Sequence, residues 1–321
     1  MRLYMYNLRP LIYDNMITFI TISVNVCTKR QKSLFNDYGR TNLFIIIILG
    51  CGFMEDIIKI DKLCFRYKSK VVFNNLDLKI KKGSFVSIIG PNGSGKTTLI
   101  RILTGLIKYD GYINIDGYNL NSFYLKDIRR KIGVVFDNPD NHFVSETVID
   151  DLAFSLENLQ YDKEDITNAI NEVSKIFKLE NILYSEPRNL TNSEKQRVAI
   201  ASSLIFNPKI LILDEALHQL TPSDKKDVLE ILKKYQKERN LTIIMITHNL
   251  ENTLYSDRIV VLNNGNIYLD GSVKDVYSSN KINSLKLDLP FVIKLSNKLI
   301  NEHIINKIYT NTIDLMEDLW P

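Results

Sequence analysis

Eight consecutive residues in the first third of the chain have the types and the spacing of a phosphate-binding loop. They follow an apolar segment, Phe85 to Ile89, and precede a segment with helical spacing, Thr98 to Leu106. The loop reads Gly90, Pro91, Asn92, Gly93, Ser94, Gly95, Lys96 and Thr97. In a strand–loop–helix unit, backbone N–H groups and the partial positive charge of the helix start face a bound polyphosphate. Lys96 would reach the β- and γ-phosphates and the Thr97 hydroxyl would help to hold Mg²⁺, so we predict that the loop, with Thr98, binds a nucleoside triphosphate.

Two acidic residues, Asp214 and Glu215, end the apolar run Ile210 to Leu213. Alone, this pattern indicates only a buried strand that meets a solvated loop. Downstream of a phosphate-binding loop it predicts catalytic chemistry instead. Asp214 would bind Mg²⁺, directly or through water, and Glu215 would polarise the attacking water as a general base.

His248 follows another apolar run, Thr242 to Thr247. A lone histidine at the end of a strand is more often structural than catalytic. Here it would lie beside the γ-phosphate, where an imidazole can form a hydrogen bond with the leaving group. We therefore predict a catalytic role for His248 together with Glu215.

The elements that must position these residues alternate along the chain. Near-continuous runs of Ile, Val and Leu are typical of strands buried on both faces of a parallel sheet. Strands are predicted at Ile57–Tyr67, Leu76–Ile80, Phe85–Ile89, Tyr112–Ile115, Ile132–Phe136, Ile210–Leu213, Thr242–Ile246 and Ile259–Leu262. Helices are predicted at Thr98–Leu106, Asp150–Leu159, Lys163–Phe177, Ser193–Phe206 and Pro222–Arg239. Thr221 is a good N-cap for the last of these, and residues 137–190 are predicted to form an inserted helical subdomain.

Composition limits the function classes. Of the 321 residues, 45% are hydrophobic and 24% are charged, as in soluble globular proteins. The formal charge is +4, but residues 1–53 hold six Lys and Arg against two acidic residues, and the remainder holds 35 of each. Residues 54–321 therefore have no net positive charge, and a positive charge is what binding to nucleic acid requires. Cys27, Cys51 and Cys64 lack C-x-x-C spacing, so they predict neither a zinc site nor a disulfide framework and fit a reducing compartment.

Residues 1–53 differ in character from the rest. The apolar stretch from Leu11 to Cys27 is interrupted by Asp14, and the stretch from Leu43 to Leu49 is too short to span a bilayer. A signal peptide would carry the chain away from cytosolic ATP. We expect translation to start at Met54, which makes 1–53 an extension of doubtful reality, and an amphipathic membrane anchor is the alternative.

Together these motifs resemble those of the ATP-binding cassette (ABC) ATPases, over Met54 to about Val276. The resemblance implies a P-loop NTPase fold of ABC type. Such a fold has a RecA-like parallel-sheet α/β core, an N-terminal antiparallel β part and an inserted helical subdomain. It also implies ATP and Mg²⁺ as cofactors. Tyr67 matches the aromatic residue that stacks on adenine, although a strand-end tyrosine without that role is the alternative.

A narrower resemblance is to the ATPases of energy-coupling factor (ECF) transporters, which import vitamins and transition-metal ions. The matching segments are Val134 to Asn141, Thr147-Val148, Asp150 to Phe154, Leu287 to Phe291 and Asp314 to Trp320. The last of them resembles that group's C-terminal helix. We accordingly expect an ABC ATP-binding domain at 54–276 and a small helical C-terminal tail of the dimerisation type at 277–321.

The chain departs from the family pattern at three places. The signature, usually L-S-G-G-Q, reads Leu190, Thr191, Asn192, Ser193 and Glu194. In this family the signature of one subunit closes over ATP held by the other, and Glu194 would bring a negative charge toward a negative phosphate. Asp137 replaces a glutamine and could still ligate Mg²⁺, but it cannot donate a hydrogen bond when ionised. Thr221 replaces the aspartate that spans the dimer interface.

These departures weaken mainly what a subunit offers to its partner's ATP. The resemblance therefore implies an asymmetric heterodimer with a second ABC ATPase. ATP on Lys96 and Glu215 would be hydrolysed, whereas ATP closed by residues 190–194 would turn over slowly. A transmembrane coupling subunit, docked near Asn138–Glu146, and a substrate-binding membrane subunit would be the other partners, with no nucleic acid.

The resemblance to transport ATPases also implies a peripheral subunit on the cytoplasmic face of the membrane. Because the sequence shows no transmembrane run, we expect the translocation path to belong to other chains. Two alternatives remain. One is an ATP-binding structural or regulatory partner with little hydrolysis. The other is a soluble non-transport ABC protein, which usually has two cassettes or a long coiled-coil insertion.

Overall fold

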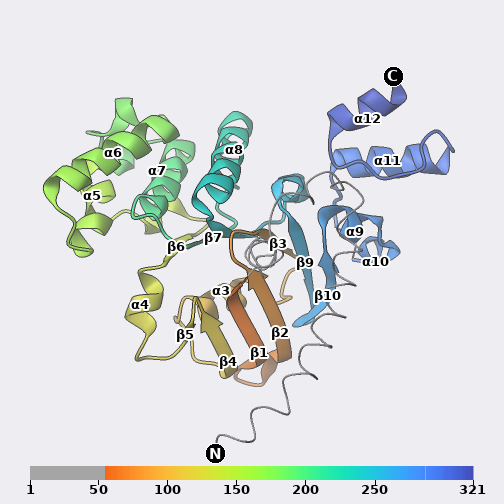
Figure 1. Cartoon of the computed structure of the whole chain (residues 1–321), viewed down its shortest axis with the longest axis horizontal. Helices are drawn as coiled ribbons and strands as arrows, with labels where there is room; N and C mark the ends of the chain where they lie inside the picture. Colours follow the sequence, from red (N-terminus) through yellow and green to blue (C-terminus); the bar gives the residue numbers. More distant parts are fainter. Residues whose placement is uncertain (1–54, 286, 321) are drawn as a thin grey trace, which may run out of the picture. The chain divides into compact units, whose positions relative to one another are not determined.

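The computed structural model describes residues 55–285 and 287–320 (Figure 1). The predicted extension 1–53 lies outside the described residues. No helix within the described ranges is both long enough and apolar enough to cross a membrane.

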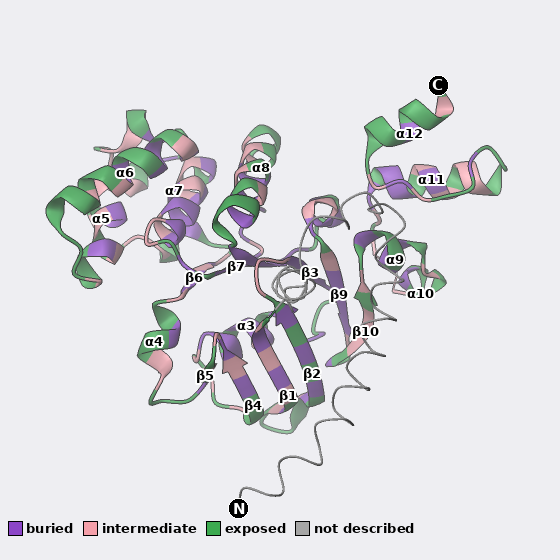
Figure 2. Ribbon diagram, viewed as in Figure 1, coloured by how far each residue is buried: buried purple, intermediate pink, exposed green. Residues whose placement is uncertain are grey.

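A six-stranded sheet in the order β10-β9-β3-β8-β7-β6 carries the candidate residues. Its strands are β3 (Phe85–Ile89), β6 (Ile132–Val135), β7 (Ile210–Asp214), β8 (Thr242–Ile246), β9 (Arg258–Asn263) and β10 (Asn266–Gly271). Neighbouring strands from β9 to β6 pair in parallel, and β10 is antiparallel to β9. Every residue of β3, β7 and β8 is buried, as their near-continuous apolar runs predict for strands covered on both faces. Figure 2 shows β7 in the colour of buried residues.

Successive residues of these strands face two different hydrophobic layers. Leu211 and Leu213 of β7 pack in one cluster with the helical layer, whereas Ile210 and Ile212 pack in the other with the second sheet. This alternation follows from the two-residue period of a strand. The helical layer contains α5 (Val148–Asn158), α6 (Lys163–Phe177), α7 (Asn192–Leu204) and α8 (Pro222–Arg239).

The second sheet is antiparallel, in the order β2-β1-β4-β5, and shares its core with α3 (Lys96–Leu103). Its strands are β1 (Asp56–Tyr67), β2 (Lys70–Lys81), β4 (Asp110–Ile115) and β5 (Tyr118–Asn119). β2 begins six residues earlier than predicted, because a tight turn pairs Lys70 with Tyr67 and brings Val71 and Phe73 into the ladder. β5 and β10 were not predicted; neither has a buried residue.

The segment 137–190 contains helices and no strand, as the sequence predicts. Besides α5 and α6 it has three short 3₁₀ helices, η1 (Pro139–Asn141), η2 (Glu180–Ile182) and η3 (Pro187–Asn189). The bounds of α6 and α8 agree with the prediction. Thr221 caps α8 as expected, because its hydroxyl accepts a hydrogen bond from the Asp224 N–H. A short helix, α4 (Leu125–Arg129), was not predicted.

The 3₁₀ helix η4 (Leu250–Tyr255) lies between β8 and β9. The helices that follow the last strand, β10, are α9 (Val273–Ser278), α10 (Asn280–Asn283), α11 (Phe291–Asn301) and α12 (Thr312–Leu319). Only Ser279 separates α9 from α10, because α9 reaches Ser278 and α10 begins at Asn280. Val276 of α9 and Ile282 of α10 are buried in one cluster with Val261 of β9. This packing against the sheet explains why the segment is helical. The predicted C-terminal helix at 314–320 overlaps α12.

Candidate functional site

The candidate residues gather at one edge of the six-stranded sheet. Ile88 of β3 and Asp214 of β7 both pair with Ile246 of β8, and Val135 of β6 pairs with Leu213. The carboxyl ends of parallel strands meet at the same edge. The segments that follow these four strands are the phosphate-binding loop, Glu215, His248 and Asp137, so the sheet brings them together.

The glycines of the loop meet two different requirements. Gly90, Gly93 and Gly95 have φ values of 149°, 77° and 109°. A Cβ at Gly90 would lie 2.0 Å from the Leu262 carbonyl oxygen, and one at Gly95 would lie 2.7 Å from the ring of Phe73. Gly93 has open space around it. The loop thus owes its close approach to strands β9 and β2 to two residues without side chains.

Lys96, the first residue of α3, is buried beneath the loop. Its Nζ donates hydrogen bonds to the carbonyl oxygens of Gly90 (2.8 Å) and Pro91 (3.0 Å). Burial lowers the pKa of this amine, while the charges of Glu215 and Asp214 oppose that shift. The amine is therefore held by the loop itself. A bound phosphate could take the place of the two neutral carbonyl oxygens as the acceptor of its hydrogen bonds, and a charged acceptor binds more strongly. Asn92, Gly93 and Thr97 are exposed, as a ligand-facing surface requires.

Asp214 provides a buried oxygen that a cation could use. Its side chain is 6% exposed, and no group in 55–285 or 287–320 donates a hydrogen bond to Oδ1. Burial and then the neighbouring Glu215 raise the pKa of Asp214 to about 6, and the charge of Asp137 adds to this. Mg²⁺ prefers hard oxygen ligands. The oxygens of Asp214, Asp137 and Thr97 fit that preference.

Glu215 and His248 contact each other. The His248 backbone N–H donates to Glu215 Oε2 (3.1 Å), and the imidazole Nε2 lies 3.3 Å from Oε1. Glu215 has a left-handed backbone, with φ of 55°. Non-glycine residues in this region are uncommon and gather at functional sites. The arrangement orients a carboxylate that remains partly exposed, which a general base requires.

The predicted signature turn starts α7 and is capped by its own side chains. The Thr191 N–H donates to Glu194 Oε2 (2.8 Å), and the Glu194 N–H donates to Thr191 Oγ1 (3.3 Å). This capping box holds the pKa of Glu194 below its ordinary value, chiefly through the bond from the Thr191 N–H. The negative charge predicted here is therefore present, but the carboxylate folds back onto its own turn. The Leu190 side chain is buried in the core, which leaves only its backbone for a ligand.

The signature turn does not join the other candidates. Within the described residues, no hydrogen bond or ion pair connects 190–194 with 90–98. The side chains outside the turn that form hydrogen bonds with it are those of Gln219 and Asp224. Tyr67 ends β1 with 42% of its surface exposed and its ring edge-on to Phe65, at 4.7 Å between centroids. Its ring is thus free to take a flat ligand.

Sequence reasoning missed the residues that hold these segments in place. Gln196 Nε2 donates to the Phe136 carbonyl (3.2 Å) and Lys195 Nζ donates to Asp140 (2.7 Å), so α7 supports the segment around Asp137. The consecutive residues Lys195, Gln196 and Arg197 follow the signature directly, and their spacing gave no sign of these contacts. Asp224 could have been found, because it lies three residues after the N-cap Thr221.

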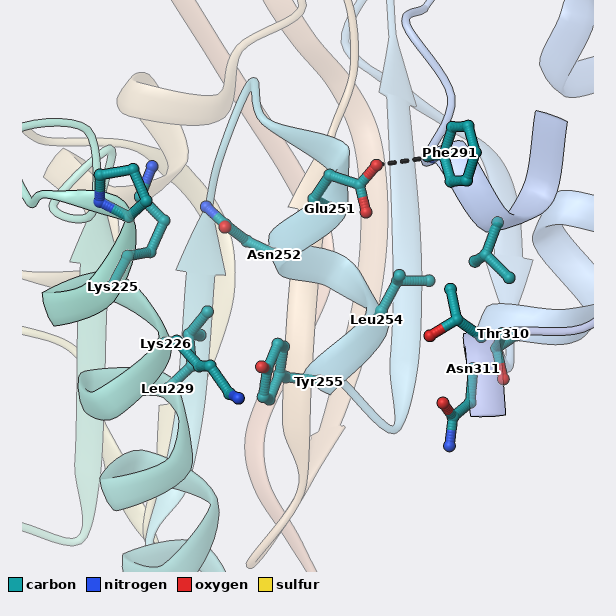
Figure 3. A pocket seen from close by; sticks show the side chains of 13 residues that line it. Lys225, Lys226, Leu229, Glu251, Asn252, Leu254, Tyr255, Phe291, Thr310 and Asn311 are labelled. Atoms are coloured by element: carbon teal, nitrogen blue, oxygen red, sulfur yellow. Dashed lines mark hydrogen bonds between the residues drawn. The ribbon is translucent and has the colours of Figure 1, made fainter. Parts of the chain in front are cut away.

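Two of the cavities that the described residues form outside this sheet edge lie beside α8 and α5. One of about 600 Å³ is bounded by α8, η4 and the starts of α11 and α12 (Figure 3). On one side of it, Glu251 accepts a hydrogen bond from the Phe291 N–H (2.6 Å), as the dashed line shows. The other, of about 240 Å³, lies between the edge strand β6, α5 and α7 and is lined in part by His142, Asp151 and Phe154. Burial raises the pKa of Asp151, although its Oδ1 accepts a bond from the Val144 N–H.

A glycine loop that opens α3, an acidic pair after β7 and a histidine after β8, on a parallel sheet backed by an antiparallel one, define a P-loop ATPase of ABC type. The family model described as ABC transporter matches residues 73–218. The energy-coupling factor transporter ATP-binding protein EcfA1 of Ligilactobacillus salivarius is 40% identical over 261 residues, which are 79% of this chain and 93% of that protein. The chain belongs to the energy-coupling factor transporter ATP-binding proteins of the ABC family, and it is an ATPase.

Solved structures agree with this assignment. CbiO1 of Clostridium perfringens, described as part of the ABC transporter complex CbiONQ, superposes with a TM-score of 0.66 at 31% identity, over 75% of this chain and 99% of that one. An ATP-binding cassette in a dimeric post-hydrolysis state, bound to ADP and Pi, superposes with a TM-score of 0.62 at 29% identity, over 67% and 98%. The predicted fold class, RecA-like core included, is confirmed.

Proposed function

We propose that this chain is the ATP-hydrolysing subunit of an ECF-type importer for a vitamin or a metal ion. ATP-driven closure of a pair of cassettes would be coupled to uptake through separate membrane subunits. The observation that carries this proposal is the meeting of the phosphate-binding loop, Asp214, Glu215 and His248 at one edge of the sheet. The names of the similar proteins, an ECF transporter subunit and a part of an ABC transporter complex, support the transport role.

Within the proposed site, each residue has one task. The loop N–H groups and Lys96 bind and orient the triphosphate, and the Tyr67 ring stacks on the base. Glu215, oriented by the His248 N–H, takes a proton from the attacking water. His248 forms a hydrogen bond with the γ-phosphate from its exposed position. Bound Mg²⁺, held by Thr97, Asp214 and Asp137, would neutralise charge on the phosphate oxygens.

The proposed pair is asymmetric, a heterodimer with a second ABC ATPase. Lys96, Asp214 and Glu215, which serve the chain's own ATP, match the family pattern. By contrast, the start of α7 presents Asn192 in place of a glycine, and Glu194 keeps a negative charge on this turn. A charge here opposes a partner's γ-phosphate. ATP on the partner would therefore turn over slowly.

The proposed docking place for a membrane subunit on the cytoplasmic side is the 240 Å³ cavity beside Asn138–Glu146. Phe154, at its rim, is 45% exposed, and Asp151 adds a buried carboxyl to its wall. The lining mixes apolar side chains with polar ones, among them His142 and Ser155, and such a surface suits one side of an amphipathic helix. We propose pairing of the C-terminal tail as well, since Ile313, Met316 and Trp320 of its last segment are more than half exposed.

The test measures ATP hydrolysis by the full chain, alone and mixed with a second ECF-type ATPase from the same genome. We expect little turnover alone and strong turnover in the mixture. Tight ATP binding with little turnover in both would reject the hydrolytic role in favour of the structural or regulatory partner. Strong turnover by the chain alone, unchanged by the second ATPase, would contradict the heterodimer.

A further inference from the structure

A network of hydrogen bonds joins the start of α7 to the start of α8. Ser193 Oγ donates to Asp224 Oδ2 (2.5 Å), and Thr221 Oγ1 donates to the same oxygen (2.9 Å). The Thr221 N–H donates in turn to Ser193 Oγ (3.2 Å). Beside them, Asn192 Nδ2 donates to Gln219 Oε1 (3.4 Å). We call this set of contacts the α7–α8 clasp.

The clasp is made by residues at which this chain departs from the ABC pattern. Asn192 and Ser193 stand where the signature has glycines, and Thr221 stands where the family has the aspartate of the dimer interface. A glycine could make none of these side-chain bonds. Ser193 is 8% exposed, so its hydroxyl faces the chain's own α8 rather than solvent. The altered residues Ser193 and Thr221 thus belong to one hydrogen-bonded network, with the Asn192 contact beside it.

Asp224 is the centre of the clasp, and it is ionised. Burial acts to raise its pKa, but the bonds from Ser193 and Thr221 and the charge of Arg197 outweigh burial, so the pKa lies below its ordinary value. Arg197 Nη1 is 3.8 Å from Asp224 Oδ1. Hydrogen bonds to an ionised acceptor are about twice as strong as neutral ones. One carboxylate therefore ties α7 to α8 through two hydroxyl groups.

The clasp lies between two functional places in the chain. On one side is the turn that starts α7, which the proposed pair presents to the partner's ATP. On the other side, only the short segment 216–220 separates Thr221 from Glu215, and the His218 N–H bonds to the Glu215 carbonyl (3.0 Å). Thr221 therefore connects the segment that follows Glu215 with the start of α7.

We propose that Asp224 is a positioning residue: through Ser193 and Thr221 it holds the start of α7 in the orientation that closes over the partner's ATP. This inference rests on the proposed pairing. It predicts that Ser193 and Asp224 act as a unit, so removing both costs no more than removing one.

The chain offers a matched control for the loss of a helix cap. Asp275 of α9 occupies the same helical position as Asp224 of α8, three residues after its N-cap, and accepts a hydrogen bond from the N-cap hydroxyl of Ser272 (2.6 Å). Asp275 has no bond to α7. The variant Asp275→Ala therefore removes a comparable cap and leaves the clasp intact.

The experiment uses the full chain with Glu215→Gln, which slows its own hydrolysis, and a second ECF-type ATPase from the same genome. At saturating Mg-ATP, the apparent Kd of the two proteins is measured by sedimentation for Ser193→Ala, Asp224→Ala, the double variant and Asp275→Ala. We expect the first three to raise the Kd about tenfold each, with no further rise in the double variant. Asp275→Ala should leave the Kd unchanged, and the unfolding temperature of each chain alone shows whether it still folds.

The outcomes separate this inference from the proposed function. If the pair assembles and Asp224→Ala behaves like Asp275→Ala, the clasp is only structural and the inference is overturned, while the pairing stands. Additive effects of Ser193→Ala and Asp224→Ala would overturn it equally. If the chain carrying only Glu215→Gln does not bind the second ATPase in the presence of Mg-ATP, the proposed pairing is wrong and the inference is wrong with it.

Discussion

The approach of the phosphate-binding loop to β2 gives a sharp test of how the loop is built. In Gly95→Ala, the added Cβ would lie 2.7 and 2.8 Å from two ring atoms of Phe73, a side chain only 1% exposed. Ordinary contact begins at 3.4 Å, so ring and loop must separate by a large fraction of an ångström. The backbone φ of 109° is also one that residues with a Cβ rarely adopt.

The expected cost follows from these two terms. The backbone conformation costs about 1–2 kcal/mol for a residue with a Cβ. Overpacking against a rigid buried ring adds roughly 1–3 kcal/mol. Since each kcal/mol lowers the unfolding temperature of a domain this large by about 2–4 °C, we expect a decrease of roughly 10 °C. Because Lys96 begins α3 at the next residue, the same displacement should weaken ATP binding.

Gly117→Ala is the matched control. Gly117, in the turn between β4 and β5, has φ of 86°, and nothing lies within 4 Å of its Cβ position. In Gly117→Ala only the backbone conformation carries a cost, so the unfolding temperature should decrease by roughly 4 °C and ATP binding should be unchanged. Differential scanning fluorimetry and titration with a fluorescent ATP analogue measure both effects. Equal losses of unfolding temperature in the two variants would refute the steric argument.

Three further predictions concern the chemistry of the site. Glu215→Gln keeps an acceptor for the His248 N–H but removes the proposed general base. ATP turnover by the pair should therefore fall about 10²–10⁴-fold, while the Kd for Mg-ATP stays unchanged. Unaltered turnover would reject the role of Glu215 as the base. The pKa of Asp214, about 6, lies above its ordinary value of 3.8, so this carboxyl contributes stability that is fully present below pH 3.8 and is lost as the pH rises through about 6. Asp214→Asn should therefore raise the unfolding temperature of the nucleotide-free chain more at pH 7.5 than at pH 5, and equal shifts at both would contradict the buried-carboxyl account. Tyr67→Ala should weaken ATP binding several-fold and leave pyrophosphate binding unchanged, whereas Tyr67→Phe should bind both normally, and an equal loss for both ligands would exclude stacking on the base.

Local sequence patterns were sufficient to predict those elements in which a residue's neighbours in the chain determine its conformation. The strands β3 and β8 and the helices α6 and α8 have the predicted bounds, because their apolar periods are complete within each segment. In α8 the N-cap Thr221 also marks the start. The phosphate-binding loop could be read from its glycines and lysine alone. Short elements could not be predicted in this way: β5 forms only because its two residues pair with β4, and β10 because it pairs with β9.

By itself, the sequence determined the types of the reacting groups and the class of ATPase, since a loop of this spacing between a strand and a helix has few other uses. The tertiary structure decided which groups meet. The parallel register of β3, β8 and β7 places Glu215 against His248, which lies 33 residues away in the chain. It also decided that the altered residues Ser193 and Thr221 bond to one carboxylate. Such contacts depend on how separate elements pack, and no spacing along the chain encodes them.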